Sequence, residues 1–167
     1  MESPEALRWV HESAGIQQLG NDILSVVHPE LYHNAIQALH NLRKVELTKW
    51  AADQWVSAFT GIAVMSNRRS VPHVDRHGAP AWYDLLLTAG SYLHAELRMP
   101  EIGLSFDYDS GTAVAICGNA LLHEVQDWGE GDRICYALFM REAVLSRCGC
   151  NWVGWSTKGS YQEIDAS

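Results

Sequence analysis

The chain has 167 residues, of which 47% are hydrophobic and 19% charged, a balance typical of a globular domain that excludes a mainly disordered protein. Its net charge of −8, from 12 Lys and Arg against 20 Asp and Glu, argues against a nucleic-acid coat protein with a broad basic face. A locally basic site remains compatible with this charge, because electrostatic potentials act locally.

The length predicts one domain that is large enough to bury a sizeable core. We expect the cysteines to be free thiols in a reducing compartment, because two lie in apolar runs and the other two form a C-x-C spacing that is too short for a usual zinc pair. The chain has no signal-peptide segment and no apolar run long enough to cross a bilayer, so we expect a soluble intracellular protein. The cysteines are Cys117, Cys135, Cys148 and Cys150.

Residues 1–45 are predicted to form supporting helices. Apolar residues recur at helical spacing in two stretches, 16–27 and 31–42, and the second ends at a basic pair that the helix dipole favours. We expect both helices to be amphipathic and to pack on the outside of a sheet. The apolar faces are Ile16, Leu19, Ile23, Val26 and Val27 in the first helix, and Leu31, Ala35, Ala38, Leu39 and Leu42 in the second. The nearby histidines, His28, His33 and His40, are interpreted as surface or satisfied core residues.

Residues 46–150 are predicted to form a β-rich core. Alternating β-branched and apolar residues predict a strand within 54–65, and short strand-like runs then follow, separated by Gly, Pro, Asp or Ser. The fold class is therefore predicted as α+β with a mainly β core, a jelly-roll or cupin-like double-stranded β-helix after a helical prelude. Residues 151–167 are predicted to be a tail of the same domain. The predicted strands are 82–89, 92–97, 103–108, 112–117, 121–125 and 133–140.

Two histidines and an aspartate suggest a metal site. His73 and Asp75 are two residues apart, so an extended strand would place both side chains on one face. His123 lies 48 residues further on, enough for several strands to carry the chain around a barrel, and it is surrounded by apolar residues. Two imidazoles and one carboxylate form the facial triad of non-haem iron(II) oxygenases.

Arg133 opens the strand that follows His123 and suits a dicarboxylate, because the planar guanidinium binds carboxylates bidentately. Alternation would place Arg133, Cys135, Ala137 and Phe139 on one face, and the two small residues after the arginine would leave room for a short ligand. We therefore expect an iron- and 2-oxoglutarate-dependent oxygenase. The alternative, in which these groups merely pair with one another, remains open.

Four segments together resemble the TET/JBP nucleic-acid oxygenases, in particular the TET-like proteins of fungi. They are residues 67–78, the strand that begins Trp82-Tyr83-Asp84, residues 118–123, and Asp132-Arg133, and the resemblance covers residues 45–147. It implies that His73, Asp75 and His123 bind Fe(II). It also implies that Arg133 holds the distal carboxylate of 2-oxoglutarate, and that Arg68 contacts the same cosubstrate.

The resemblance further implies a nuclear enzyme that uses O2 to hydroxylate methyl groups on DNA bases, 5-methylcytosine or N6-methyladenine, after flipping the base out of the duplex. Asp84 is a candidate acceptor for the exocyclic amine of that base. Gly78 stands where some relatives have an acid that touches cytosine, and the space it leaves would suit a purine. Arg76 and His77, with Arg69, would form a basic mouth for phosphates.

Two kinds of alternative remain open. The same chemistry could act on RNA, on a free nucleobase or on a small molecule, or the chain could be a non-catalytic cupin-like binding module. The sequence does not indicate an oligomeric state, the final oxidation product or the preferred DNA context.

Overall fold

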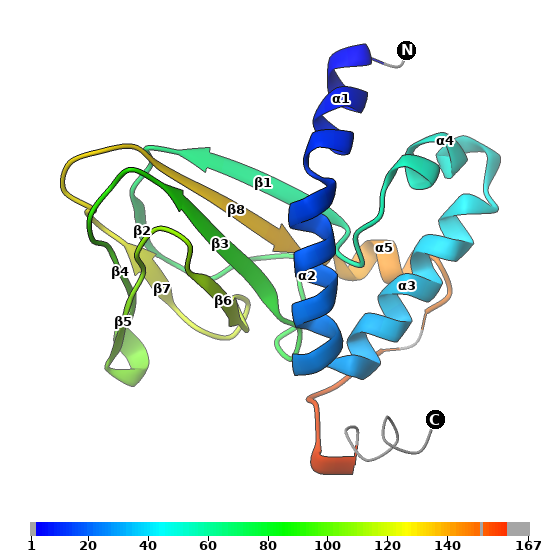
Figure 1. Ribbon diagram of the computed structural model, residues 1–167. Helices are drawn as coiled ribbons and strands as arrows, with labels where there is room; N and C mark the ends of the chain where they lie inside the picture. Colours follow the sequence, from blue (N-terminus) through cyan, green and yellow to red (C-terminus); the bar gives the residue numbers. More distant parts are fainter. Residues whose placement is uncertain (1–2, 151, 160–167) are drawn as a thin grey trace. The chain divides into compact units, whose positions relative to one another are not determined.

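A computed structural model describes residues 3–150 and 152–159, which fall into two compact units. One unit contains the described parts of Met1–Thr60 and Glu142–Ser167 and is helical, whereas Gly61–Arg141 is built from strands (Figure 1). This is the predicted α+β class. Among the described residues, no helix is long and apolar enough to cross a membrane.

The helical unit confirms the two predicted helices and adds three that were not predicted individually. Proline occupies the first position of the helices Pro4–Glu12 and Pro29–Arg43 and of the 3-10 helix Pro100–Ile102, where its missing N–H costs nothing. Pro29 directly follows the capping residue His28. The His28 ring accepts a hydrogen bond from the Leu31 N–H at 3.4 Å. The helices are α1 Pro4–Glu12, α2 Ala14–Val27, α3 Pro29–Arg43, α4 Glu46–Gln54 and α5 Glu142–Arg147.

The buried face of α2 is partly polar, and two of the five residues of its predicted apolar face are exposed. Leu19 and Val26 are 47% and 69% exposed, whereas Gln17 and Asn21 are buried. The Gln17 carbonyl accepts from the N–H groups of residues 56 and 57, and Asn21 bonds the Ala58 N–H and the carbonyl of residue 56. Apolar spacing located the helix but did not identify the face that packs.

The same hydrogen bonds correct the strand predicted within 54–65. Helix α4 runs to Gln54, residues 55–60 have no regular strand, and β1 begins only at Gly61. The backbone groups of residues 56–58 bond the side chains of α2 instead of a neighbouring strand, because an amide side chain can replace a ladder partner.

The strand unit contains two four-stranded antiparallel sheets, with orders β1-β8-β3-β6 and β2-β7-β4-β5. The chain passes repeatedly from one sheet to the other, which is the winding of a double-stranded β-helix and confirms the predicted fold. The strands are β1 Gly61–Ser66, β2 Ser70–His73, β3 Asp84–Gly90, β4 Glu96–Met99, β5 Leu104–Asp107, β6 Ala113–Ile116, β7 His123–Val125 and β8 Arg133–Phe139. A short 3-10 helix, η1 Pro100–Ile102, connects β4 and β5.

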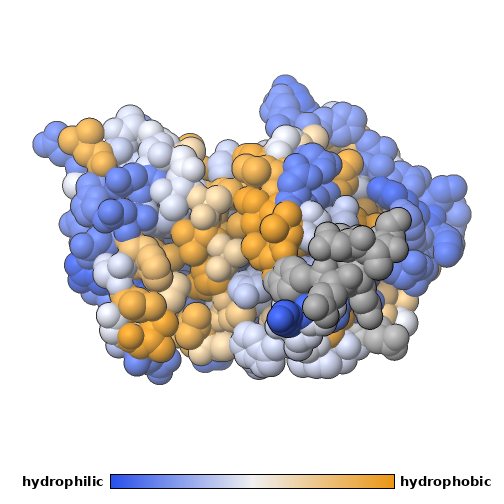
Figure 2. Space-filling view, turned by 60° about the horizontal axis from the view of Figure 1, so that its bottom comes forward, coloured by the Kyte–Doolittle hydropathy of each residue, from blue (hydrophilic) through white to orange (hydrophobic). Residues whose placement is uncertain are grey.

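The two sheets share one apolar core. Leu86 on β3 and Cys135 on β8 pack in the same cluster as Leu97 on β4 and Val125 on β7, together with Tyr108. Burial of such side chains is the main stabilising contribution, at about 25 cal/mol per Å² of apolar surface. Some apolar side chains stay outside the core, and the face drawn in Figure 2 carries hydrophobic patches between hydrophilic ones.

Candidate metal and cosubstrate site

His73 and His123 face each other across two paired strands. His73 ends β2, His123 begins β7, and they are register partners in the antiparallel pair, with ring centroids 4.4 Å apart. The two histidines of the predicted metal site are thus brought together on neighbouring strands. His123 is buried and His73 is half-buried.

Asp75 does not share a strand with His73, which corrects the predicted route to their proximity. Strand β2 ends at His73, and Asp75 lies in the connection that follows. The turn before β7 holds Asp75, whose N–H donates to the Gly118 carbonyl at 2.9 Å and whose carbonyl accepts from the Asn119 amide at 2.8 Å. A Cβ on Gly118 would lie 2.7 Å from Asp75 Oδ2, so only glycine fits this approach.

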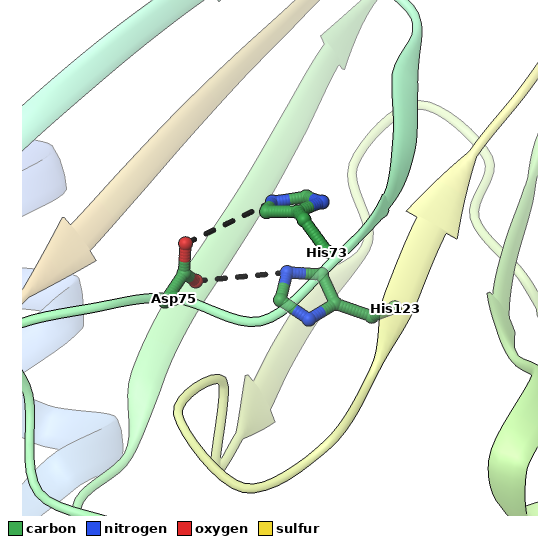
Figure 3. Close-up of side chains that lie close together, drawn as sticks. All are labelled: His73, Asp75 and His123. Carbon is green, nitrogen blue, oxygen red and sulfur yellow. Dashed lines mark ion pairs between the residues drawn. The ribbon is translucent and has the colours of Figure 1, made fainter.

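The Asp75 carboxylate points at both imidazoles (Figure 3). Its Oδ1 lies 3.7 Å from His73 Nε2 and its Oδ2 lies 3.6 Å from His123 Nε2, which is too long for hydrogen bonds. One ligand atom from each of these three residues lies within 4.8 Å of the others. The three side chains thus converge within ion-pair distance of one another but form no hydrogen bond among themselves.

The opposite nitrogens of the two rings show how these histidines fit a metal. His73 Nδ1 lies 2.8 Å from the Val71 carbonyl, and His123 Nδ1 lies 2.9 Å from the Leu121 carbonyl. A carbonyl requires a proton on Nδ1, so each neutral ring presents the lone pair of Nε2 toward Asp75. Metal-binding histidines are commonly fixed in this way by a carbonyl on the other nitrogen.

These three residues line a cavity of about 220 Å³ in the strand unit. Arg68, Arg76 and Arg141 also line it, and all three are exposed, so the cavity is bordered by positive charge although the whole chain carries −8. Arg133 is a fourth cationic residue in the lining and lies deeper. Of the predicted basic mouth, Arg76 contributes to this border, whereas Arg69 and His77 do not line the cavity.

Arg133 is 4% exposed, and its Nε atom has no hydrogen-bond partner among the residues that the structure describes. The guanidinium lies 5.1 Å from the centroid of the Tyr108 ring and 5.9 Å from that of Trp128. Within the described ranges 3–150 and 152–159 it forms no ion pair with a carboxylate, which is costly for a buried cation. The arginine is therefore poised for an anionic ligand.

The predicted alternation along β8 is confirmed, since Arg133, Cys135, Ala137 and Phe139 all line the cavity. All four cysteines of the chain are free, as predicted. Burial raises the pKa of the Cys135 thiol, so it stays protonated beside the arginine and contributes no competing charge.

Asp84 begins β3 and also lines the cavity, where it is only 7% exposed. Burial, with the nearby charge of Asp75, raises its pKa to about 7. A Cβ on Gly118 would lie 2.5 Å from Asp84 Oδ2, so the two carboxylates flank the same glycine. The acid faces the cavity and not solvent.

The remaining predicted contacts divide into two groups. Gly78 and Arg76 line the cavity, whereas His77, with φ of 81°, does not line it. Arg69 lies 3.0 Å from Asp127 in an exposed ion pair, so its charge is already partnered.

Sequence reasoning missed several residues that line the cavity, Tyr108 and Arg141, or contact its lining, Trp128 and Asn119. Tyr108 and Trp128 flank Arg133, and Asn119 holds Asp75. Arg141 follows the end of β8 and lies with its guanidinium 5.1 Å from the centroid of the Phe139 ring. Only the extension of the β8 alternation by two residues, from 139 to 141, could have indicated Arg141 in advance.

Comparisons with known proteins bear on the fold and the family of this chain. A solved structure of NgTET1 in complex with 5mC DNA has a TM-score of 0.62 with this chain at 15% identity, and the match covers 96% of this chain and 60% of NgTET1. This chain thus spans less than two thirds of that relative, and the likeness concerns the fold. A cupin 2 conserved barrel domain protein from Salinispora arenicola has a TM-score of 0.40 at 17% identity, covering 53% of this chain and 68% of that one. A search of curated proteins gave no match.

A family model gives the assignment. The TET/JBP model, described as the oxygenase domain of the 2OGFeDO superfamily, matches residues 8–142, which is most of the chain. The superfamily uses Fe(II), 2-oxoglutarate and O2, and the three converging side chains could hold the metal. The chain belongs to the TET/JBP family of oxygenases.

Proposed function

We propose that this protein is an Fe(II)- and 2-oxoglutarate-dependent dioxygenase that oxidises methylated bases in DNA. The observation that carries the proposal is a single cavity that holds three converging metal-ligand side chains, a buried arginine without a carboxylate partner, and a buried carboxylate. Each of these groups has bonding capacity that the described protein atoms do not use. Together they match a metal, a dicarboxylate and a base.

Fe(II) would be held by His73, Asp75 and His123. Two neutral imidazoles and one carboxylate leave coordination positions open, and iron held in this way activates O2 while 2-oxoglutarate is oxidised to succinate and CO2. The protein contributes the orientation of the ligands, through the carbonyls behind both rings and the turn that holds Asp75.

Arg133 would bind the distal carboxylate of 2-oxoglutarate. It is buried in the cavity, and a bidentate carboxylate would satisfy its unpartnered Nε. Arg68 lines the same cavity from the connection between β1 and β2 and would contact the cosubstrate as well. Cys135 and Ala137, the next inward residues of β8, are small and leave room for the ligand.

Asp84 and Gly78 would form the base-reading part of the cavity. Because the pKa of Asp84 is about 7, both its neutral and its ionised form exist near neutral pH, and the carboxyl can donate to a ring nitrogen or accept from an exocyclic amine. Gly78 adds no side chain, which leaves space for a purine as well as a pyrimidine. Phe139 presents a ring to the cavity on which a flipped base could stack.

The DNA backbone would lie along the exposed arginines of the cavity, Arg76 and Arg141, with His77 in the adjacent connection. Phosphate contacts of this kind position the duplex without reading its sequence. The NgTET1 structure, which holds 5mC DNA, supports DNA as the substrate class. Both 5-methylcytosine and N6-methyladenine remain candidate bases.

The test is an incubation with Fe(II), 2-oxoglutarate and matched oligonucleotides, followed by digestion and mass spectrometry of the nucleosides. The oligonucleotides are DNA duplexes with 5-methylcytosine or N6-methyladenine, the unmethylated duplex, and RNA with the same methylated bases. We expect oxidised nucleosides from methylated DNA only. Oxidation confined to RNA, or succinate formation that no oligonucleotide stimulates, would refute the DNA assignment.

Anaerobic addition of Fe(II) and 2-oxoglutarate separates an enzyme from a non-catalytic binding module. The assembled site should give a visible charge-transfer band that His73→Ala abolishes. A wild-type protein that gives no band and forms no succinate would be a binding module.

A further inference from the structure

Asn67 lies directly after β1 with φ of 49°, in the left-handed region of backbone conformation. Residues other than glycine rarely adopt this region, and asparagine is among the few that are enriched there. The last register pair between β1 and β8 joins Ser66 to Ile134. Asn67 therefore stands where this ladder ends and the chain turns away.

Three hydrogen bonds join Asn67 to the beginning of β8. Its N–H donates to the Arg133 carbonyl at 2.8 Å, and its Oδ1 accepts from the Arg133 N–H at 2.7 Å. Its Nδ2 donates to Asp132 Oδ1 at 2.7 Å. The side-chain carbonyl of Asn67 thus serves as an extra ladder acceptor, and both backbone polar groups of Arg133 are bonded to one residue.

The two arginines proposed to bind 2-oxoglutarate both adjoin these hydrogen bonds. Arg68 is the next residue in the chain after Asn67, and Arg133 receives the two backbone hydrogen bonds. Both arginines line the cavity. On its other side Arg133 is the register partner of Gly90 of β3. Both backbone polar groups of Arg133 are used by Asn67, so the hydrogen bonds that hold its backbone come from this one residue.

We propose that Asn67 is a positioning residue for the cosubstrate, which fixes the Arg133 backbone and the start of Arg68 so that both guanidiniums meet one dicarboxylate. This inference rests on the proposed 2-oxoglutarate function of Arg133. A planar guanidinium binds a carboxylate bidentately only within a narrow range of orientations, so its backbone must be held. Asn67 itself contacts none of the three proposed metal ligands in its described hydrogen bonds.

The decisive variant is Asn67→Asp. An aspartate can still accept from the Arg133 N–H and tolerates the left-handed conformation, but it places a second carboxylate against Asp132 in place of the donor. We expect the Kd of 2-oxoglutarate to rise about tenfold, as for one lost charge-assisted hydrogen bond. The Kd would be measured calorimetrically at saturating Mn(II), which prevents turnover.

The double variant Asn67→Asp/Asp132→Asn restores the hydrogen bond with donor and acceptor exchanged. It also keeps the net charge of the wild type, which separates lost geometry from a general electrostatic penalty on a dianion. We expect its Kd for 2-oxoglutarate to return to within about threefold of the wild type. The Kd of Mn(II) should stay within about twofold of the wild type in both variants, because each metal ligand keeps its own hydrogen bonds.

Asn119→Ala is the matched control, because this asparagine holds the metal ligand Asp75 and no arginine. It should weaken Mn(II) binding about tenfold and leave the Kd of 2-oxoglutarate at saturating metal near the wild-type value. Thermal unfolding of every variant checks that the fold is retained. Asn67→Gly, which keeps the left-handed backbone without the amide, replaces Asn67→Asp if the latter does not fold.

The proposal is overturned if the single variant binds 2-oxoglutarate like the wild type, if the double variant binds no better than the single one, or if metal affinity falls in parallel. Failure of the proposed function looks different. In that case the wild type itself does not bind 2-oxoglutarate, or Arg133→Gln binds it equally well.

Discussion

The helical unit and the strand unit both bury polar side chains, but the two units differ in how fully these side chains are hydrogen-bonded. In the helical unit the amides of Gln17 and Asn21 bond backbone groups of residues 56–58 at 2.7–3.1 Å. His28 is fully buried, and its two ring nitrogens lie 3.4 Å from the Leu31 N–H and 3.0 Å from the Gly154 carbonyl. These groups use their hydrogen-bonding capacity within the unit.

In the strand unit, buried polar groups of the cavity have hydrogen-bonding capacity that the described protein atoms do not use. The Arg133 Nε has no partner in the described part of the chain, and His123 Nε2 is 3.6 Å from Asp75, beyond hydrogen-bond distance. Unsatisfied buried polar groups cost free energy, so a fold retains them where a ligand satisfies them. Burial alone therefore does not mark a functional residue. The Oγ atom of Ser156 in the helical unit also has no described partner, and Arg133 differs from it because it is a buried cation that lines the same cavity as the three converging side chains.

The largest effect is expected from His123→Ala. The variant removes one of three proposed iron ligands, so the Kd of Fe(II) should rise by more than the 10- to 100-fold that is typical when a group orienting a ligand is lost, roughly 1000-fold. Fe(II) affinity and nucleoside oxidation would both be measured. His94→Ala is the control, because His94 is an exposed histidine paired with Asp109 outside the cavity. Equal losses in both variants would contradict the assignment.

Arg133→Gln should raise the Kd of 2-oxoglutarate roughly 100-fold, the worth of a buried charge-assisted pair. The fold should not be destabilised, because the wild-type cation is buried without a carboxylate partner. The measurements are calorimetric binding at saturating Mn(II) and thermal unfolding. Arg98→Gln, which loses only an exposed ion pair with Glu96, should bind like the wild type. A destabilised Arg133→Gln protein would show that the arginine serves the fold.

Asn21→Ala should produce the opposite pattern, a loss of stability with cosubstrate affinity retained in the folded protein. It leaves the Ala58 N–H and the carbonyl of residue 56 without their described partners, at a cost of about 2–3 kcal/mol in the free energy of unfolding. Urea unfolding measures this loss. Gln18→Ala, which removes an exposed contact with Asp22 on the same helix, should cost less than about 0.5 kcal/mol. Similar costs for both variants would contradict a structural role for buried amides.

The fold and the chemically specific residues of the site could be predicted from the sequence. The fold followed from strand-length apolar runs with turn residues between them, and the site followed from residue types that are chemically specific. His73, Asp75, His123 and Arg133 were found in this way and do line one cavity. The inward face of β8 could be predicted without knowledge of packing, because alternate side chains along a strand point to the same face.

Packing partners chosen by geometry could not be predicted. The sequence does not show that an α2 amide, and not a strand, bonds residues 56–58, because that choice depends on which segment comes near. The position of Asp75 depends likewise on a turn that begins at Gly118, 43 residues further along the chain. Arg69 was expected to face phosphates but pairs with Asp127, since an exposed arginine binds whichever acid the fold brings to it.

The smallest effect concerns His28, whose neutral ring accepts at Nδ1 from the Leu31 N–H and donates at Nε2 to the Gly154 carbonyl. Desolvation lowers its pKa below the ordinary 6.5, so the unfolded chain binds a proton more readily than the folded one. The stability from neutral His28 is thus fully present above pH 6.5 and decreases as pH falls toward the lower folded pKa.

His28→Asn keeps a capping acceptor that does not titrate, so its unfolding free energy should depend less on pH between about 5 and 7 than that of the wild type. Urea unfolding at each pH measures this difference, with the exposed His40→Asn as control. An equal pH dependence in wild type and His28→Asn would contradict the assignment of a hydrogen bond to each ring nitrogen of His28.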